Sequence, residues 1–307
     1  MLKDWIRPLL RPLPQWSTIA AAPPSTIVTA TLRWHGQEAD VTADHTVAAL
    51  KPLVIATSVD AGEQPVLEYR DSVSGSLLGR LQLQRCGSVA TDQHTIALYQ
   101  VSAGEHHCLA WPQRQWHAWL QNRSMLKNRQ PQHLGMEPQA VQQLMIAYLC
   151  PRPVVLVSVS VPGHRNIFPM DLIGPLQRSG LYSLALRSTN ISEPVMREAR
   201  KVVLSSVPAA MKATVYKLSE HHKQPPSDWA ALPFPLRPSH EYAIPAVAAA
   251  LHIRELQIVH SERIGSHTFF LARVSANEKL ADGEQLHHTA GFHQAYRRQR
   301  HAPFVEV

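Results

Sequence analysis

Residues that can bind an anion stand together shortly before a predicted helix. Arg187, Ser188 and Thr189 precede Ser192, whose side chain can cap the first free amides of a helix that extends to Arg200. A guanidinium, hydroxyls and helix amides are groups that bind phosphate. The alternative is a solvated loop with ordinary capping roles. The sequence therefore offers a candidate phosphate site here.

Other polar side chains lie at the ends of predicted strands, where they can reach a bound ligand. Asn166 and Asp171 follow the first strand of the C-terminal half, and ordinary turn chemistry is the alternative for them. His267 opens the second strand of a predicted hairpin, and its alternative is a half-buried strand histidine. Ser205 and Ser206 end another strand. We treat all five as candidate ligand contacts.

Metal binding and covalent hydrolysis find little support. The histidine pairs at 106–107, 221–222 and 287–288 consist of adjacent residues, which point to opposite faces of a strand, and no carboxylate completes a triad at helical spacing. No GxSxG elbow is present. The three cysteines are too scattered for a CxxC site and are expected to be reduced thiols. We expect no metal.

The C-terminal half alternates helices with β-branched runs. Helices are predicted from 137 to 148, where Val141, Leu144, Met145 and Tyr148 form one apolar face, and at 192–200 and 245–253. Strands are predicted at 154–161, 181–186 and 202–207, followed by a hairpin of 256–263 and 267–276. The proline-rich segment 222–245 is predicted to be a lid over the ligand site. This order favours a β-barrel decorated by helices over a parallel sheet.

The N-terminal half is predicted to be mostly β. Strands are expected at 26–32, 53–59, 77–84 and 95–101, after an irregular leader at 1–24 and before a polar linker at 121–134. The predicted domains are the leader 1–24, a β-rich domain 25–134 and a barrel domain 135–307. The predicted fold class is mostly β with additional α-helices.

The C-terminal half also resembles a known family. Residues 144–161 read LMIAYLCPRPVVLVSVSV, followed by Pro-Gly and an Asn-x-x-Pro segment at 166–169, and residues 265–274 read GSHTFFLARV. In order and spacing these segments are similar to the flavin reductase-like family over about 140–290. The resemblance implies a split β-barrel, usually a homodimer that binds FMN at the subunit interface and often reduces it with NADH or NADPH.

The resemblance also implies roles for the candidate residues. Asn166 and Asp171 would contact the pyrimidine edge or the ribityl hydroxyls of the flavin. Ser205 and Ser206 would contact the ribityl chain. The loop from Arg187 through Ser188 to Thr189 would bind the phosphate. His267 would face the flavin or the nicotinamide as the catalytic candidate. The chain departs from the family at Ser266 and Ala272, where Asp and Gly are usual.

Two sequence echoes suggest an internal repeat. Residues 51–62 can be aligned with 152–163, and residues 80–83 and 93–103 with 255–258 and 266–276. The N-terminal domain is therefore either a degenerate second split barrel or an unrelated β-rich domain. A homodimer is expected, or a pseudo-dimer within one chain if the first half is a second barrel.

Composition narrows the function classes. The 307 residues carry a net charge of +7, but no nucleic-acid-binding motif accompanies the basic residues. The longest apolar run, 154–161, is too short to span a bilayer. We therefore expect neither nucleic acid nor a membrane as a partner. We expect a cytoplasmic location. The leading hypothesis is an FMN-binding oxidoreductase. The alternative is a non-catalytic split-barrel binding or assembly protein with weak or no flavin binding.

Overall fold

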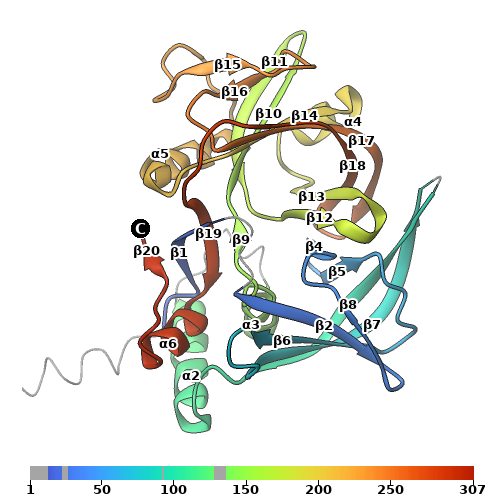
Figure 1. Cartoon of the computed structure of the whole chain (residues 1–307), viewed down its shortest axis with the longest axis vertical. Helices are drawn as coiled ribbons and strands as arrows, with labels where there is room; N and C mark the ends of the chain where they lie inside the picture. Colours follow the sequence, from blue (N-terminus) through green and yellow to red (C-terminus); the bar gives the residue numbers. More distant parts are fainter. Residues whose placement is uncertain (1–12, 23–26, 92, 128–135) are drawn as a thin grey trace, which may run out of the picture.

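The computed structural model describes residues 13–22, 27–91, 93–127 and 136–307, and β-strands dominate them. The N-terminal half forms a seven-stranded antiparallel sheet, lower right in Figure 1. Its strands in spatial order are β3 (Gln37–Asp40), β2 (Val28–Trp34), β6 (Val66–Asp71), β7 (Leu77–Ala90), β8 (Thr95–His106), β5 (Leu53–Thr57) and β4 (His45–Leu50). The four strands predicted in this half are confirmed, and β7 and β8 are longer than predicted.

The C-terminal half forms a second seven-stranded antiparallel sheet, which curves strongly at the top of Figure 1. Its strands in spatial order are β11 (His164–Met170), β10 (Val155–Val161), β14 (Lys201–Ser206), β17 (His252–Ile264), β18 (His267–Lys279), β13 (Leu181–Arg187) and β12 (Ile173–Leu176). The predicted strands, the hairpin and the short helix α4 (Glu193–Ala199) are confirmed.

The two sheets share one topology. We number the spatial positions 1 to 7 from the β3 edge of one sheet and from the β11 edge of the other. Successive strands along the chain occupy positions 2, 1, 7, 6, 3, 4 and 5 in both sheets. The echo between 80–83 and 255–258 therefore falls on equivalent strands, β7 and β17, and that between 93–103 and 266–276 falls on β8 and β18. The alignment of 51–62 with 152–163 is wrong, because β5 occupies the position of β13 and not that of β10.

A smaller sheet lies beside both large ones. It has the order β20 (Val305–Glu306), β1 (Trp16–Ala21), β19 (Gln285–Ala290) and β9 (Arg152–Pro153). The prediction of an irregular leader is wrong for β1, which pairs with β19 from Trp16 opposite Ala290 to Ala21 opposite Gln285. Leader residues 13–15 and 22 belong to no helix or strand, and 1–12 and 23–24 lie outside the described ranges. Helix α6 (Gly291–Gln299) follows β19 directly and was not predicted.

Helix α3 (Pro138–Ala147) is confirmed and packs on the N-terminal sheet. Its apolar face contacts β7 and β8 closely, and two glycines make this approach possible. A Cβ at Gly79 would meet Leu149, and one at Gly104 would meet Ile146 and Leu81. The predicted linker 121–134 is wrong for its first part, because helix α2 (Trp111–Lys127) continues through it, and 128–134 lies outside the described residues.

The proline-rich segment packs on the outer face of the C-terminal sheet. In β10, Val155 and Val157 face the inner core, whereas Leu156 faces outward and contacts a cluster that includes Phe234 and Ile244. Most of 222–245 thus covers that outer face, and only its first residues reach the pocket described below. The predicted helix at 245–253 is wrong: β16 (Pro245–Val247) pairs with β15 (Leu236–Pro238), and this pairing overrides the helix propensity of the alanines.

The two large sheets dock through reciprocal turns. The turn between β4 and β5 meets the hairpin turn of β17 and β18, where Ser266 N donates to Lys51 O at 2.9 Å. A Cβ at Gly265 would collide with the same carbonyl oxygen of Lys51. Conversely, the short helix η3 (Gln177–Ser179) after β12 reaches the N-terminal sheet, where Arg178 N donates to Asp44 Oδ1 at 3.0 Å. Each sheet therefore receives the corresponding turn of the other.

None of the helices in the described ranges combines the length and apolar character that a membrane crossing requires.

Candidate functional site

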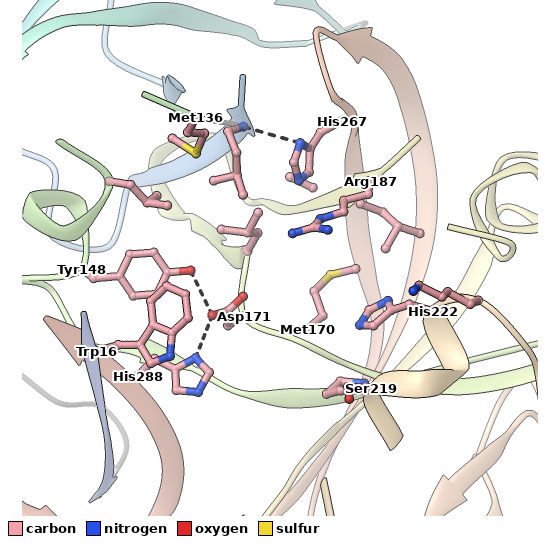
Figure 2. Close-up of a pocket in the computed structure, with 17 residues that line it drawn as sticks. Trp16, Met136, Tyr148, Met170, Asp171, Arg187, Ser219, His222, His267 and His288 are labelled. Atoms are coloured by element: carbon pink, nitrogen blue, oxygen red, sulfur yellow. Dashed lines mark hydrogen bonds and ion pairs between the residues drawn. The ribbon is translucent and has the colours of Figure 1, made fainter. Parts of the chain in front are cut away.

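A pocket of about 460 Å³ opens where the two large sheets, the small sheet and α3 meet. Figure 2 shows its walls. Much of the lining is apolar, and polar side chains project from several elements. The lining residues are Trp16, Leu50, Met136, Leu144, Tyr148, Pro169, Met170, Asp171, Leu172, Ala185, Leu186, Arg187, Ser219, His222, Lys223, His267 and His288.

Arg187 is the last residue of β13 and extends its guanidinium into the pocket (Figure 2). It pairs in register with His267 at the start of β18, which places both side chains on the same wall. Burial lowers the pKa of Arg187, and the nearby carboxylate of Asp171 opposes this shift. The pocket therefore holds a partly desolvated cation.

Asp171 lies between β11 and β12 and accepts two hydrogen bonds on one oxygen. Tyr148 Oη donates to Oδ2 at 2.9 Å, and His288 Nδ1 lies 2.8 Å from the same atom. Burial raises the pKa of Asp171, but the hydrogen bonds from His288 and Tyr148 outweigh it, so the pKa lies below its ordinary value. Asp171 is therefore ionised at neutral pH, and its hydrogen-bonding neighbours must donate.

Two histidines of the pocket are neutral at physiological pH. Burial, with the charge of Arg187, lowers the pKa of His267 to about 4 and that of His222 to about 4. His267 Nδ1 accepts a weak hydrogen bond from the Leu50 amide at 3.5 Å and lies 2.9 Å from Ser266 Oγ. His267 is thus held against the turn of the N-terminal sheet.

The predicted phosphate loop is only partly at the pocket. Arg187 lines the cavity, whereas Ser188 bonds the carbonyl of Ser266 and Thr189 is exposed outside it. The helix N-terminus at Ser192 has no room for an anion, because Ser192 is fully buried and Asn190 Oδ1 accepts its amide hydrogen. Of the predicted phosphate loop, only Arg187 lines the pocket.

Three other candidates make hydrogen bonds away from the pocket. Asn166 is buried and donates to Ser192 Oγ and to the carbonyl of His221, both at 2.8 Å. Ser205 Oγ accepts the Val247 amide hydrogen, and Ser206 Oγ lies 3.5 Å from a guanidinium nitrogen of Arg254. None of the three lines the pocket. Asp171, Arg187 and His267 are the predicted residues that the structure brings together there.

Sequence reasoning missed five polar residues of the pocket: Tyr148, Ser219, His222, Lys223 and His288. Tyr148 was placed on the apolar face of its helix, and the histidines were considered only as metal ligands. Their common signal is a polar atom on a residue at an element end, which is too frequent to single out a site. Within the described ranges, no group of three or more His, Cys, Asp and Glu side chains is arranged to hold a metal ion.

Comparison with known proteins finds similar folds among flavoproteins. The FMN-binding protein of Thermus thermophilus is 22% identical over 42% of this chain and 72% of its own, with a TM-score of 0.37. The NADH:FAD oxidoreductase of Streptomyces globisporus is 18% identical over 50% and 89%, with a TM-score of 0.42. The flavin reductase component of a bacterial two-component tryptophan halogenase is 15% identical over 49% and 93%, with a TM-score of 0.43. These are the kind of protein that the sequence resembles.

No protein-family model matches the chain. No curated protein matches it by sequence either.

Proposed function

We propose that the pocket binds FMN and that the protein is an oxidoreductase in which NADH or NADPH supplies the hydride. The observation that carries this proposal is the Arg187 guanidinium, which extends into a mainly apolar cavity that is also lined by the carboxylate of Asp171. A planar, largely apolar ligand that also carries an anionic group and an N–H donor suits such a combination.

The parts of the pocket correspond to the parts of this ligand. A volume of about 460 Å³ lies in the range of small-molecule sites. Leu50, Leu144 and Leu172 offer apolar surface for a ring system. Arg187 and the exposed Lys223 offer positive charge for a phosphate, and Asp171 offers an acceptor for a ring N–H.

A bound flavin would supply the hydride chemistry, and the chain would bind and orient it. Leu172 and Leu186 would keep water from the ring. The neutral imidazoles of His222 and His267 would present no competing charge, so that the cation of Arg187 would dominate the field on the ligand.

We further propose that each seven-stranded sheet is a split barrel and that one chain completes the site as a pseudo-dimer. The shared topology of the two sheets and the position of Leu50, which lies at the end of β4 and lines the pocket, support this arrangement. The homodimer remains the alternative. Light scattering on the full chain tests the two: the pseudo-dimer predicts the mass of one 34.3 kDa chain.

The experiment for the function is a titration of the purified chain with FMN, FAD and riboflavin, followed by anaerobic addition of NADH or NADPH. We expect one FMN per chain, weaker binding of riboflavin because it lacks the phosphate, and bleaching by a nicotinamide. Failure to bind any of the three flavins would overturn the proposal. Flavin uptake without bleaching by either nicotinamide would support the non-catalytic alternative.

A further inference from the structure

Four side chains form a continuous hydrogen-bonded series that leads out of the pocket. His288 Nδ1 lies 2.8 Å from Asp171 Oδ2, and its Nε2 lies 2.7 Å from Tyr216 Oη. Tyr216 Oη in turn lies 2.6 Å from Thr18 Oγ1. Asp171 lies in the β11–β12 connection and His288 in β19. Tyr216 lies in α5 (Lys212–Lys217) and Thr18 in β1.

We propose that Asp171, His288, Tyr216 and Thr18 form a proton path between the pocket and the outside of the protein. Its inner end, Asp171, lines the cavity, whereas Tyr216 and Thr18 are half-buried and do not line it. The use of the path rests on the proposed function, but its existence as a proton-conducting series does not.

The chemistry of the four groups suits transfer in either direction. An imidazole carries a proton on either nitrogen, and the Tyr and Thr hydroxyls both donate and accept. When Nδ1 of His288 donates to the carboxylate, Nε2 accepts from Tyr216, and Tyr216 accepts from Thr18. When one proton enters at Thr18 and another leaves His288 for Asp171, each group between them passes on one proton and receives another. The donor and acceptor of each hydrogen bond are then exchanged.

Packing holds the central ring in place. The His288 imidazole stacks on Trp16, with centroids 6.2 Å apart, and on Tyr216, with centroids 5.9 Å apart. Both of its nitrogens are therefore fixed toward their partners, as a relay requires.

The charged and titratable groups around the path favour an ionised inner end. Arg152 lies opposite His288 in the register of β9 and β19, and its positive charge lowers the pKa of Asp171 in addition to the hydrogen bonds from Tyr148 and His288. Arg187 faces Asp171 from the other wall of the pocket. His287, beside His288 in β19, has its pKa lowered by burial and is neutral at physiological pH.

Such a path has a defined use in a hydride reaction. One hydride transferred from a nicotinamide to a flavin carries two electrons and leaves one negative charge in the pocket, beside the ionised Asp171. One proton moved inward from Thr18 to Asp171 and on to the reduced ring neutralises that charge, and a proton from solvent replaces it at Thr18. Two like charges held close in a low-dielectric site would otherwise oppose the reduction.

Tyr216→Phe is the decisive variant, because it keeps the ring that stacks on His288 and removes only the hydroxyl that links it to Thr18. Tyr182→Phe, at a buried tyrosine of β13 outside the path, is the matched control. With FMN bound, a pH-indicator dye in stopped flow reports proton uptake after reduction by NADH. We expect uptake to keep pace with bleaching in wild type and Tyr182→Phe, and to lag at least about tenfold in Tyr216→Phe with unchanged FMN affinity. Equal uptake rates in the two variants would overturn the path.

A second readout needs no flavin. Nitrogen NMR of the ligand-free chain follows the two His288 ring-nitrogen signals at one fixed pH. We expect Tyr216→Phe to displace the Nε2 signal and Asp171→Asn the Nδ1 signal, because each variant changes the hydrogen-bond partner of that nitrogen, and Tyr182→Phe to leave both signals in place. If His288 does not respond to Tyr216→Phe, the series is not connected, whether or not the protein binds flavin. If it responds but no flavin binds, the proposed function fails and the path stands.

Discussion

Nδ1 of His288 lies 2.8 Å from Oδ2 of Asp171, although 117 positions separate the two residues along the chain. This contact joins β19 of the small sheet to the connection between β11 and β12 of the C-terminal sheet. The pocket therefore depends on pairing between the two ends of the chain, because β19 is itself held by β1.

Arg187→Ala should weaken FMN binding by about 1.5 to 3 kcal/mol, the range for a hydrogen bond to a charged group, which corresponds to about 10- to 100-fold in Kd. Fluorescence titration measures the affinity. Arg165→Ala is the control, because Arg165 is exposed on β11 and stacks over Trp229 away from the pocket. Equal affinities of the two variants would place the phosphate elsewhere.

Leu50→Trp should reduce FMN affinity at least about tenfold, because an indole at the end of β4 would occupy part of the cavity. Val73→Trp introduces the same side chain in the turn between β6 and β7, at a residue that is 92% exposed, and should leave binding unchanged. The same titration compares them. If Leu50→Trp binds FMN normally, the N-terminal half does not form part of the site.

Acid should lower the free energy of unfolding already at pH values well above those at which carboxylates take up protons. Burial lowers the pKa to about 3 for His45, His106 and His293 and to about 4 for His222 and His267. Their unfolded pKa is about 6.5, so the unfolded chain binds more protons between these limits. The contribution of these histidines to the free energy of unfolding is therefore fully present above about pH 6.5. It decreases as the pH falls toward 4, by up to about 1.4 kcal/mol per pH unit for each histidine.

His106→Phe isolates one of these contributions. The His106 ring stacks on Phe292 with centroids 3.9 Å apart, and its Nδ1 has no partner among the described residues, so phenylalanine keeps the contact and cannot titrate. Urea unfolding at pH 7.5 and pH 5 should show a smaller pH dependence than in wild type. His240→Phe, at an exposed position, should keep the full dependence. An unchanged slope in His106→Phe would contradict the assignment.

Gly265→Ala should loosen the docking of the two large sheets. Its φ is +53° and its Cβ would collide with the Lys51 carbonyl, whereas Gly163 has a φ of +81° and open space around its Cβ position. Gly163→Ala should therefore cost about 1 kcal/mol of backbone strain, and Gly265→Ala about 2 kcal/mol more from overpacking. Urea unfolding of both variants gives the difference, and equal costs would mean that the turn of β4 and β5 yields easily.

Local signals predicted most strands but not their long-range partners. The β-branched run at 154–161 and the hairpin around Gly265 needed only composition and turn residues, and both are confirmed. The strand Trp16–Ala21 was missed because the pairing that stabilises it is with Gln285–Ala290, at the far end of the chain. The alanines at 248–250 suggested a helix, but the residues just before them, Pro245–Val247, pair with Leu236–Pro238, and a local pattern does not contain that partner.

For the same reason, only some of the candidate site residues lie together in the structure. Arg187, Asp171 and His267 lie at strand ends that the topology brings to one cavity. Asn166 is equally polar, but it lies within β11, and its side chain turns inward to Ser192. Which way a polar side chain points depends on the neighbouring elements, and a local pattern does not contain them.

The tandem arrangement of the two seven-stranded sheets also bears on how such a site can change over generations. In a symmetric homodimer one codon specifies both copies of a position, so a substitution that closes one site closes both. Here Asp44, before β4, and Asp171, before β12, occupy corresponding connections but are encoded separately. Asp44 accepts a hydrogen bond from the amide of Arg178 in the C-terminal half, whereas Asp171 lines the open cavity. The two corresponding connections can therefore change independently of each other: one makes a contact between the sheets, and the other lines a cavity.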